Sequence, residues 1–343
     1  MSIILTIIVL GVLIFVHELG HFLTARRIGI PVYEFALGFG YKVLSFTRNG
    51  VEYTLRLIPL GGFVRMAGEE PGDNEDPNGY SHRTPWEKIK VSVAGPLMNL
   101  LLGLLIFIYS YAFIGLPHPT NEPVIGRVIS GEPAAMAGVQ PGDRVLAIDG
   151  QPISTWDQIT TVMSQKPAGE NITLTLQRDG QTLNLEMAPR QNSSTGNPAI
   201  GVMGQLVYEK QGIVQSVVYG FQQTFMLTGA LLSGIWSIIT GAASSGDLAG
   251  PVGITMMVGE ASQYGAIFLL SFIAFLSINL GILNLLPIPA LDGSKVIFAL
   301  AEILRRKPID PEKEGLIHWL GFLLLMLLIV FVTYNDILRL IKG

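Results

Sequence analysis

Two histidines and a glutamate stand close together in the first apolar stretch of the chain, as His17-Glu18-Leu19-Gly20-His21. Residues four apart lie on one face of a helix, so both imidazoles can reach one metal ion. Glu18 lies beside that face, where its carboxylate can take a proton from metal-activated water. The alternative is a pair of histidines that hydrogen-bond between packed helices. Because ionisable groups inside a membrane usually have a function, the pattern favours a metal site.

The composition is that of an integral membrane protein. Of the 343 residues, 49% are hydrophobic and 14% are charged, and the mean hydropathy is +0.47. The net charge of −4 offers no basic surface for nucleic acid, so no nucleic-acid partner is expected. The chain has no cysteine, which excludes disulfides and thiolate ligands. Any metal must therefore be bound by His, Asp or Glu.

Apolar stretches predict where the chain crosses the bilayer. A span needs roughly 20 apolar residues, and we expect transmembrane helices at 1–25, 91–116, 265–289 and 316–334. The first lacks the basic start and short length of a signal peptide, which indicates a retained helix. The stretch 213–241 is interrupted by glutamines and small residues. It either spans or lies in the interface as an amphipathic helix, and we expect the second.

Basic residues predict the orientation. Residues 26–90 carry nine Lys and Arg, residues 290–315 carry five, and the much longer stretch 117–212 carries six. If 213–241 does not span, both basic loops lie on the cytoplasmic side, as the positive-inside rule requires. Four spans with both termini outside is the topology that we expect.

The region 26–90 between the first two spans predicts strands and a loop. Apolar and polar residues alternate on both sides of Asn49-Gly50, which is a strong hairpin signal. A sheet this apolar is expected to dip into the membrane, with its backbone paired or lining a cavity. The alternative is a cytosolic hairpin on the membrane surface. Residues 68–79 follow as an acidic loop, for which we expect only solvation.

Residues 121–190 predict a compact module on the outer side. A short small-residue helix leads to turns at Gly142-Asp143 and Asp149-Gly150, and an alternating hairpin turns at Asp179-Gly180. This run resembles a PDZ domain of the bacterial protease type. Such domains bind extended peptides at a sheet edge, so the module either binds a peptide or acts as a bulky filter.

A catalytic metal usually has a third protein ligand, and Asp292 is the candidate. It follows the third span, where Pro287 and Pro289 end the helix and Gly293 allows a tight turn. In the four-span topology Asp292 lies near the cytoplasmic side, level with the histidine pair. The alternative role for Asp292 is a turn-forming Asp-Gly. The remaining histidines lie in loops or open the last span without a partner: His82, His118 and His318.

Several motifs in one order resemble the site-2 protease family of intramembrane metalloproteases, closest to the bacterial regulator of sigma-E protease group. They cover nearly the whole chain: HELGH at 17–21, LIPLGGFVRM at 57–66, AGPLMNLLL at 94–102, the PDZ module, LAGPVGI at 248–254 and NLLPIPALDG at 284–293. Two features depart from the family pattern. The chain has room for a single PDZ domain, and Ser294-Lys295 replaces the commoner ending of the last motif.

The resemblance implies a zinc ion and a set of site residues. His17, His21 and Asp292 match the zinc ligands, and Glu18 matches the general base. The other matching positions bind the substrate backbone (Asn279, Asn284 and the hairpin residues Gly61, Gly62 and Phe63) or support the site (Pro96 and Asn99).

We therefore expect a polytopic α-helical membrane protein of about four spans, with a membrane-associated β-hairpin and an inserted PDZ domain. The resemblance implies regulated intramembrane proteolysis in the bacterial inner membrane, with the active site toward the cytoplasm. The implied substrates are single-span proteins already trimmed outside, such as an anti-sigma factor, or remnant signal peptides. The rival functions are a transporter, for which internal repeats are missing, and a non-catalytic PDZ receptor with structural histidines.

Overall fold

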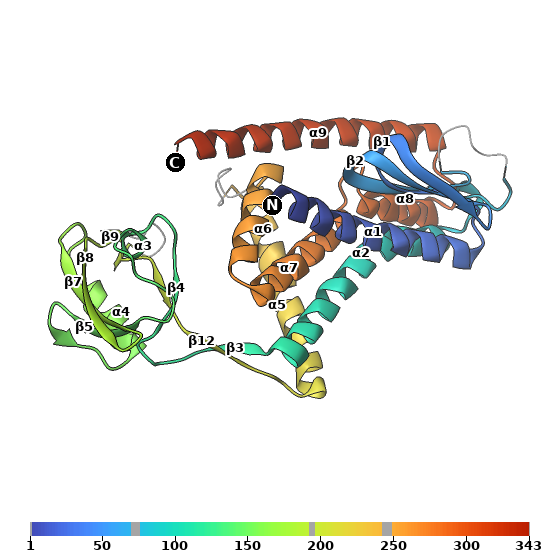
Figure 1. Ribbon diagram of the computed structural model, residues 1–343. Helices are drawn as coiled ribbons and strands as arrows, with labels where there is room; N and C mark the ends of the chain where they lie inside the picture. The colour runs from blue at the N-terminus through green and yellow to red at the C-terminus, as the bar shows by residue number, and fades with distance from the viewer. Residues whose placement is uncertain (1, 70–75, 192–195, 242–248, 343) are drawn as a thin grey trace. The chain divides into compact units, whose positions relative to one another are not determined.

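The computed structural model describes residues 2–69, 76–191, 196–241 and 249–342 (Figure 1). The chain divides into two compact units. Unit 1 combines Met1–Phe113 with Gly212–Gly343, and unit 2 is the intervening segment Ile114–Gln211. Residues 70–75 of the expected acidic loop, and the first residue of the motif at 248–254, lie outside the described residues.

Unit 1 is mainly helical. Its long elements are α1 (Ser2–Ile28), α2 (Pro85–Tyr109), α5 (Ile213–Ile239), α6 (Pro251–Gln263), α7 (Ala266–Leu285), α8 (Asp292–Arg305) and α9 (Pro311–Lys342). Four helices in the described part of the chain are long and apolar enough to cross a membrane: α1, α2 with the turn that follows it, α7 and α9. The 27-residue helix α5 is not among them. The expected polytopic fold class is confirmed.

Helix α2 is the central element of unit 1. Thr84 and Glu87 form a capping box at its start, and Pro85 occupies the first turn, where its missing N–H costs nothing. The helix packs against α1, α7 and α8. A side chain at Gly20 of α1 would collide with the backbone of α2 at Ala94. Small residues at this crossing therefore let the two backbones approach closely, as is usual between membrane helices.

The expected hairpin is present as β1 (Val32–Arg48) and β2 (Val51–Met66). Asn49 and Gly50 both have positive φ, 50° and 79°, which matches the two-residue turn that such a pair favours. The two strands pair antiparallel, with Arg48 opposite Val51. The sequence prediction of a hairpin turn at this dipeptide is confirmed.

The hairpin folds back on itself, so its two long strands make a broader sheet. Phe35 lies opposite both Val64 and Tyr53, which places the start of β1 between the two ends of β2. The buried side of this sheet packs on the end of α1, where Phe22 contacts the rings of Phe35 and Tyr53. Among the described residues, the segment 62–66 has a strand partner on one side only. Its other edge is available for pairing.

Unit 2 is built on a four-stranded sheet of order β6-β5-β7-β8. Its core includes Ile125, Val145, Ile148, Leu174 and Leu176. Its elements are β3 (Leu116–Pro119), β4 (Ile125–Val128), α3 (Pro133–Met136), β5 (Arg144–Ile148), β6 (Gln151–Pro152), α4 (Trp156–Ser164), β7 (Ile172–Arg178), β8 (Gln181–Met187), β9 (Arg190–Gln191), β10 (Pro198–Ala199), β11 (Val202–Gly204) and β12 (Leu206–Glu209). The unit reaches beyond 121–190 on both sides, because β3 pairs with β12 and β4 pairs with β11.

Candidate metal centre

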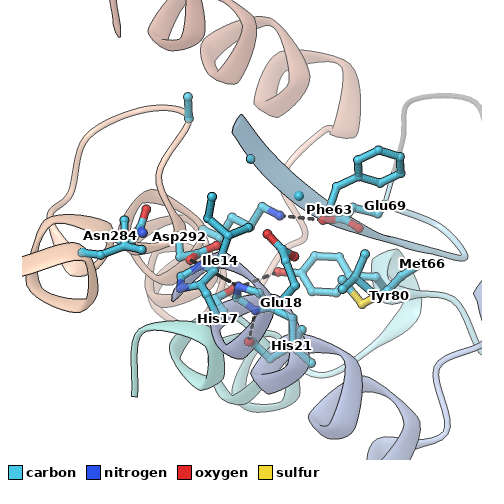
Figure 2. A pocket seen from close by; sticks show the side chains of 18 residues that line it. Ile14, His17, Glu18, His21, Phe63, Met66, Glu69, Tyr80, Asn284 and Asp292 are labelled. Carbon is cyan, nitrogen blue, oxygen red and sulfur yellow. Dashed lines mark hydrogen bonds and ion pairs between the residues drawn. The ribbon is translucent and has the colours of Figure 1, made fainter. Parts of the chain in front are cut away.

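Three side chains from α1 and the start of α8 meet in unit 1. The Nε2 atoms of His17 and His21 lie 3.2 Å apart. Oδ2 of Asp292 lies 3.0 Å from the first of these nitrogens and 3.3 Å from the second. Both histidines are buried, and Figure 2 shows the three groups pointing toward one another. The three residues expected as ligands are therefore brought together.

The other ring nitrogen of each histidine is held by α2. Nδ1 of His21 donates to the carbonyl oxygen of Val91 at 2.8 Å, which leaves its Nε2 free to bind a metal. Nδ1 of His17 lies 3.3 Å from the Asn99 side-chain nitrogen, while the buried Oδ1 of Asn99 has no hydrogen-bond partner. The oxygen and nitrogen of an asparagine amide are assigned from the hydrogen-bond network. With the two atoms of Asn99 exchanged, Oδ1 accepts the proton on Nδ1 of His17. His17 then also presents a free Nε2.

This donor set fits a zinc ion. With both Nε2 atoms unprotonated, three electron pairs face one another at 3.0 to 3.3 Å. They repel unless a cation lies between them. Ligands about 2.1 Å from a tetrahedral zinc lie roughly 3.4 Å from one another, close to the separations in the cluster. The bonds from Asn99 and Val91 are the kind of outer contacts that orient metal-binding histidines.

Glu18 lines the same cavity, which has a volume of about 380 Å³. The edge of β2 forms another wall through Gly61, Gly62 and Phe63. A Cβ on Gly62 would lie 3.1 Å from Cγ of Glu18, so the strand passes directly over the candidate base. A side chain at position 62 would therefore press on Glu18.

Of the other residues expected at the site, some line the cavity and some do not. Asn284 lines the cavity, and Figure 2 shows it on the opposite side of the histidine pair from Phe63. Asn279 is half-buried on α7 and is not among the described residues that line the cavity. Pro96 lies outside the cavity, with its carbonyl oxygen against Gly281 of α7. It acts in helix packing.

Two residues of the cavity form an ion pair that no motif of the sequence marks. Lys295 donates to Glu69 at 2.6 Å beside the Tyr80 ring. Burial alone would lower the pKa of Lys295, but the Glu69 carboxylate outweighs it and raises the pKa above its usual value. Burial also raises the pKa of Tyr80 to about 12. Lys295 follows Asp292 by three residues, so the two side chains lie on one face of α8. This spacing could have identified Lys295 as a site residue from the sequence.

The expectation of a purely solvated acidic loop is wrong for Glu69. Its side chain is 22% exposed and lies against Lys295 in the cavity. The reason is tertiary, because the chain that leaves β2 brings Glu69 against Lys295 in the first turn of α8. No pattern within 68–79 marks one of its acidic residues for this contact.

Known proteins resemble the chain over nearly its full length. The model of peptidase family M50 matches residues 5–328. The regulator of sigma-W protease RasP of Bacillus subtilis is 33% identical over 419 residues, covering 99% of each chain. The zinc metalloprotease RasP of Geobacillus kaustophilus is 35% identical, covering 98% of this chain and 97% of the relative. A putative zinc metalloprotease of Clostridium perfringens is 38% identical, covering 98% and 99%.

A solved PDZ domain of an SdrC-like protein from Listeria monocytogenes superposes on 27% of this chain and 94% of that domain, with 18% identity and a TM-score of 0.23.

The candidate spans, a His-His-Asp cluster that could hold a metal ion and the match to peptidase family M50 together define an intramembrane metalloprotease of the zinc-dependent class. The chain belongs to peptidase family M50, the site-2 protease family. The resemblance found in the sequence is confirmed, and with it the assignment as a zinc metalloprotease.

Proposed function

We propose that the chain cleaves single-span membrane proteins within or beside the bilayer, with His17, His21 and Asp292 holding the zinc and Glu18 as the general base. The observation that carries this proposal is the placement of Glu18 between the ligand cluster and the free edge of β2. A structural histidine pair has no need of an adjacent carboxylate in a cavity.

The residues have separate chemical tasks. His17, His21 and Asp292 would hold the zinc ion, which when bound would supply Lewis-acid chemistry for activating a carbonyl and a water molecule near neutral pH. Glu18 accepts the proton of the attacking water on a carboxylate oxygen. It then donates that proton to the leaving amide nitrogen, which completes hydrolysis. Asn99 holds His17 so that its Nε2 faces the metal position.

The substrate must be extended to react. A helix uses its carbonyls in its own hydrogen bonds, so a transmembrane substrate has to unwind first. The edge at Gly62–Val64 has no second strand beside it in the described part of the chain and lines the cavity of the ligand cluster, so an unwound segment can add there as a strand. Asn284 on the opposite wall offers an amide to the substrate backbone.

The substrate class is a membrane-spanning anti-sigma factor already trimmed outside, with remnant signal peptides second. The name of the Bacillus subtilis relative, a regulator of sigma-W protease, supports this choice. Unit 2 is the filter against bulky ectodomains. Cleavage of a full-length and of a pre-trimmed tagged substrate tests the filter, because equal rates would remove the role of unit 2.

The active site faces the cytoplasm in this proposal. A second cavity of about 580 Å³ shares Glu69, Tyr80 and Lys295 with the first. Its lining includes Asp310, in the basic connection before α9, and Glu314, in the first turn of α9. Since hydrolysis consumes water, the charged side chains that line this cavity support a water path from the side to which the positive-inside rule assigns that connection.

Single cysteines test the topology, because the chain has none of its own. Gln181→Cys in unit 2 and Lys307→Cys after α8 both replace exposed residues. A membrane-impermeant maleimide should label the first in intact cells and the second only after the membrane is opened. Labelling of Lys307→Cys in intact cells would refute the orientation.

The catalytic test is Glu18→Gln. This variant should keep its zinc and lose cleavage of a tagged single-span substrate, since an amide cannot carry the proton. Glu260→Gln changes an exposed carboxylate on α6 in the same way and should cleave normally. Retained cleavage by Glu18→Gln, or substantially less than one zinc per chain in the wild-type protein, would reject the proposal.

A further inference from the structure

The loop that presents Asp292 has an unusual backbone. Helix α7 ends at Leu285 and α8 begins at Asp292, so the six residues between them set the position of the carboxylate. Ala290, two residues before it, has a φ of +75°. A residue with a Cβ is strained in that region. Such a conformation persists only where neighbouring groups hold it.

The hydrogen bonds of this loop show what holds it. Pro287 and Pro289 have no N–H. The N–H groups of Leu286, Ile288 and Leu291 donate to Leu283, Leu286 and Ile288, within the loop or to the end of α7. The N–H of Ala290 donates instead to Nδ1 of His318, at 3.2 Å. The strained residue is therefore the one whose N–H is bound by a different element, α9.

Other contacts keep the His318 ring in place. The ring lies 5.6 Å from that of Phe298 on α8, edge to face. One turn further along α9, Gly321 faces Pro289 so closely that a Cβ there would collide with it. Because Nδ1 accepts the Ala290 proton, the ring carries its own proton on Nε2, on the side of Glu314.

Within the described residues, helix α9 has few other attachments. In its most apolar stretch only 11% of the residues are buried, against 28% to 50% in the other three candidate spans. A second attachment lies near its end, where Asp336 accepts from the N–H of Gly253 at the start of α6. The contact at Ala290 thus links a largely exposed helix to the loop of a metal ligand.

We propose that His318 is a positioning residue for the metal centre: by holding the Ala290 N–H it fixes the strained turn that aims Asp292 at the two histidines. The inference rests on the proposed zinc site. His318 itself touches neither substrate nor zinc. Zinc affinity then depends on the local contact between His318 and Ala290, and not on the attachment of α9 to α6 near Asp336.

The test compares zinc retention, in the purified full-length protein in detergent, at increasing chelator concentration. His318→Leu removes the acceptor and should lose zinc at about 10- to 100-fold lower chelator concentration, the usual effect of losing an outer contact of a metal ligand. His318→Asn can place Oδ1 near the former Nδ1 and should restore most of the retention. Asp336→Ala detaches α9 from α6 and should retain zinc like the wild type.

Each other outcome counts against the inference. Wild-type retention in His318→Leu, or equal loss in the Leu and Asn variants, would show that the acceptor does not matter. An equal loss in Asp336→Ala would show that any loosening of α9 suffices, without a specific role for His318. A wild-type protein that binds no zinc would instead reject the proposed metal site, so the two failures are distinguishable.

Discussion

Replacing Gly62 by alanine tests how closely the edge of β2 approaches Glu18, the proposed catalytic base. Gly62 does not have a positive φ, so alanine introduces no backbone strain there. Its Cβ would lie 2.9 Å from Cγ2 of Ile14, 3.0 Å from the carbonyl oxygen of Ala36 and 3.1 Å from Cγ of Glu18. Ordinary contacts between carbon atoms are about 3.5 to 4.0 Å. The added methyl group must therefore displace the strand or Glu18 by roughly 0.5 Å or more.

The expected loss is in the chemical step. A misplacement of about 1 Å in an active site can cost roughly 100-fold in rate. For about half that shift or more, we expect Gly62→Ala to reduce kcat about 10- to 100-fold, which is about 1.4 to 2.7 kcal/mol in the activation free energy. The proposed zinc ligands lie on α1 and α8, so zinc content should stay at the wild-type level.

The assay is single-turnover cleavage of a tagged single-span substrate by purified enzyme in detergent, with zinc measured on the same samples. Gly11→Ala is the matched control, because a Cβ at Gly11 on α1 meets nothing within 4 Å. It should cleave at the wild-type rate. A wild-type rate for Gly62→Ala would refute the close approach of the strand to Glu18, and a loss of zinc would place the damage at the metal centre instead.

Three further outcomes follow from polar groups elsewhere. Asn99→Leu should weaken zinc retention about 10- to 100-fold, while Asn99→Asp, which keeps an acceptor, should bind zinc more tightly than the leucine variant. Lys88 donates to both carboxylate oxygens of Glu302 at 3.0 Å in a buried pair. Lys88→Met leaves the Glu302 charge buried without its partner and should lower the free energy of unfolding by about 3 to 5 kcal/mol in thermal unfolding. Adding Glu302→Leu removes that charge and should recover most of the loss. In unit 2, burial alone would raise the pKa of Asp143, but hydrogen bonds led by those from Arg178 outweigh it and lower the pKa. The ionised Asp143 carboxylate therefore stabilises unit 2 above its unfolded pKa of about 3.9, and this stabilisation is lost as pH falls through the lower folded pKa. Hydrogen exchange in the full chain should show that unit 2 opens in acid, and that Asp143→Asn makes this opening less pH-dependent.

Several features were predictable because they depend on neighbours in the chain. The turn at Asn49-Gly50 needs two residues that tolerate positive φ, and the pair marks it directly. The spacing of His17 and His21 reports a shared helix face. Asp292 could be named as a candidate ligand because the count of basic residues predicts its loop on the same side of the membrane as the histidine pair. The family resemblance indicated the same residue.

Other features escaped the sequence because they arise between segments whose separation along the chain says nothing about their distance. Glu69 was expected to be solvated, yet it meets Lys295 at 2.6 Å across 226 positions. His318 was considered as a ligand and set aside, and its contact with Ala290 is invisible without the path of α9. The resemblance grouped Asn279 with Asn284, but their places on α7 put only Asn284 at the cavity.

The sequence by itself determined the apolar spans, the hairpin turn and the two histidines with their glutamate, since hydropathy and short-range periodicity are properties of consecutive residues. The tertiary structure decided how these parts make a site. Helix packing brings Asp292 to within 3.0 Å of His17 across 275 positions, α2 supplies the contacts that orient both imidazoles, and the sheet lays a strand edge over Glu18. The physical reason is that each of these contacts depends on how buried surfaces fit together, and no local stretch of sequence contains both surfaces.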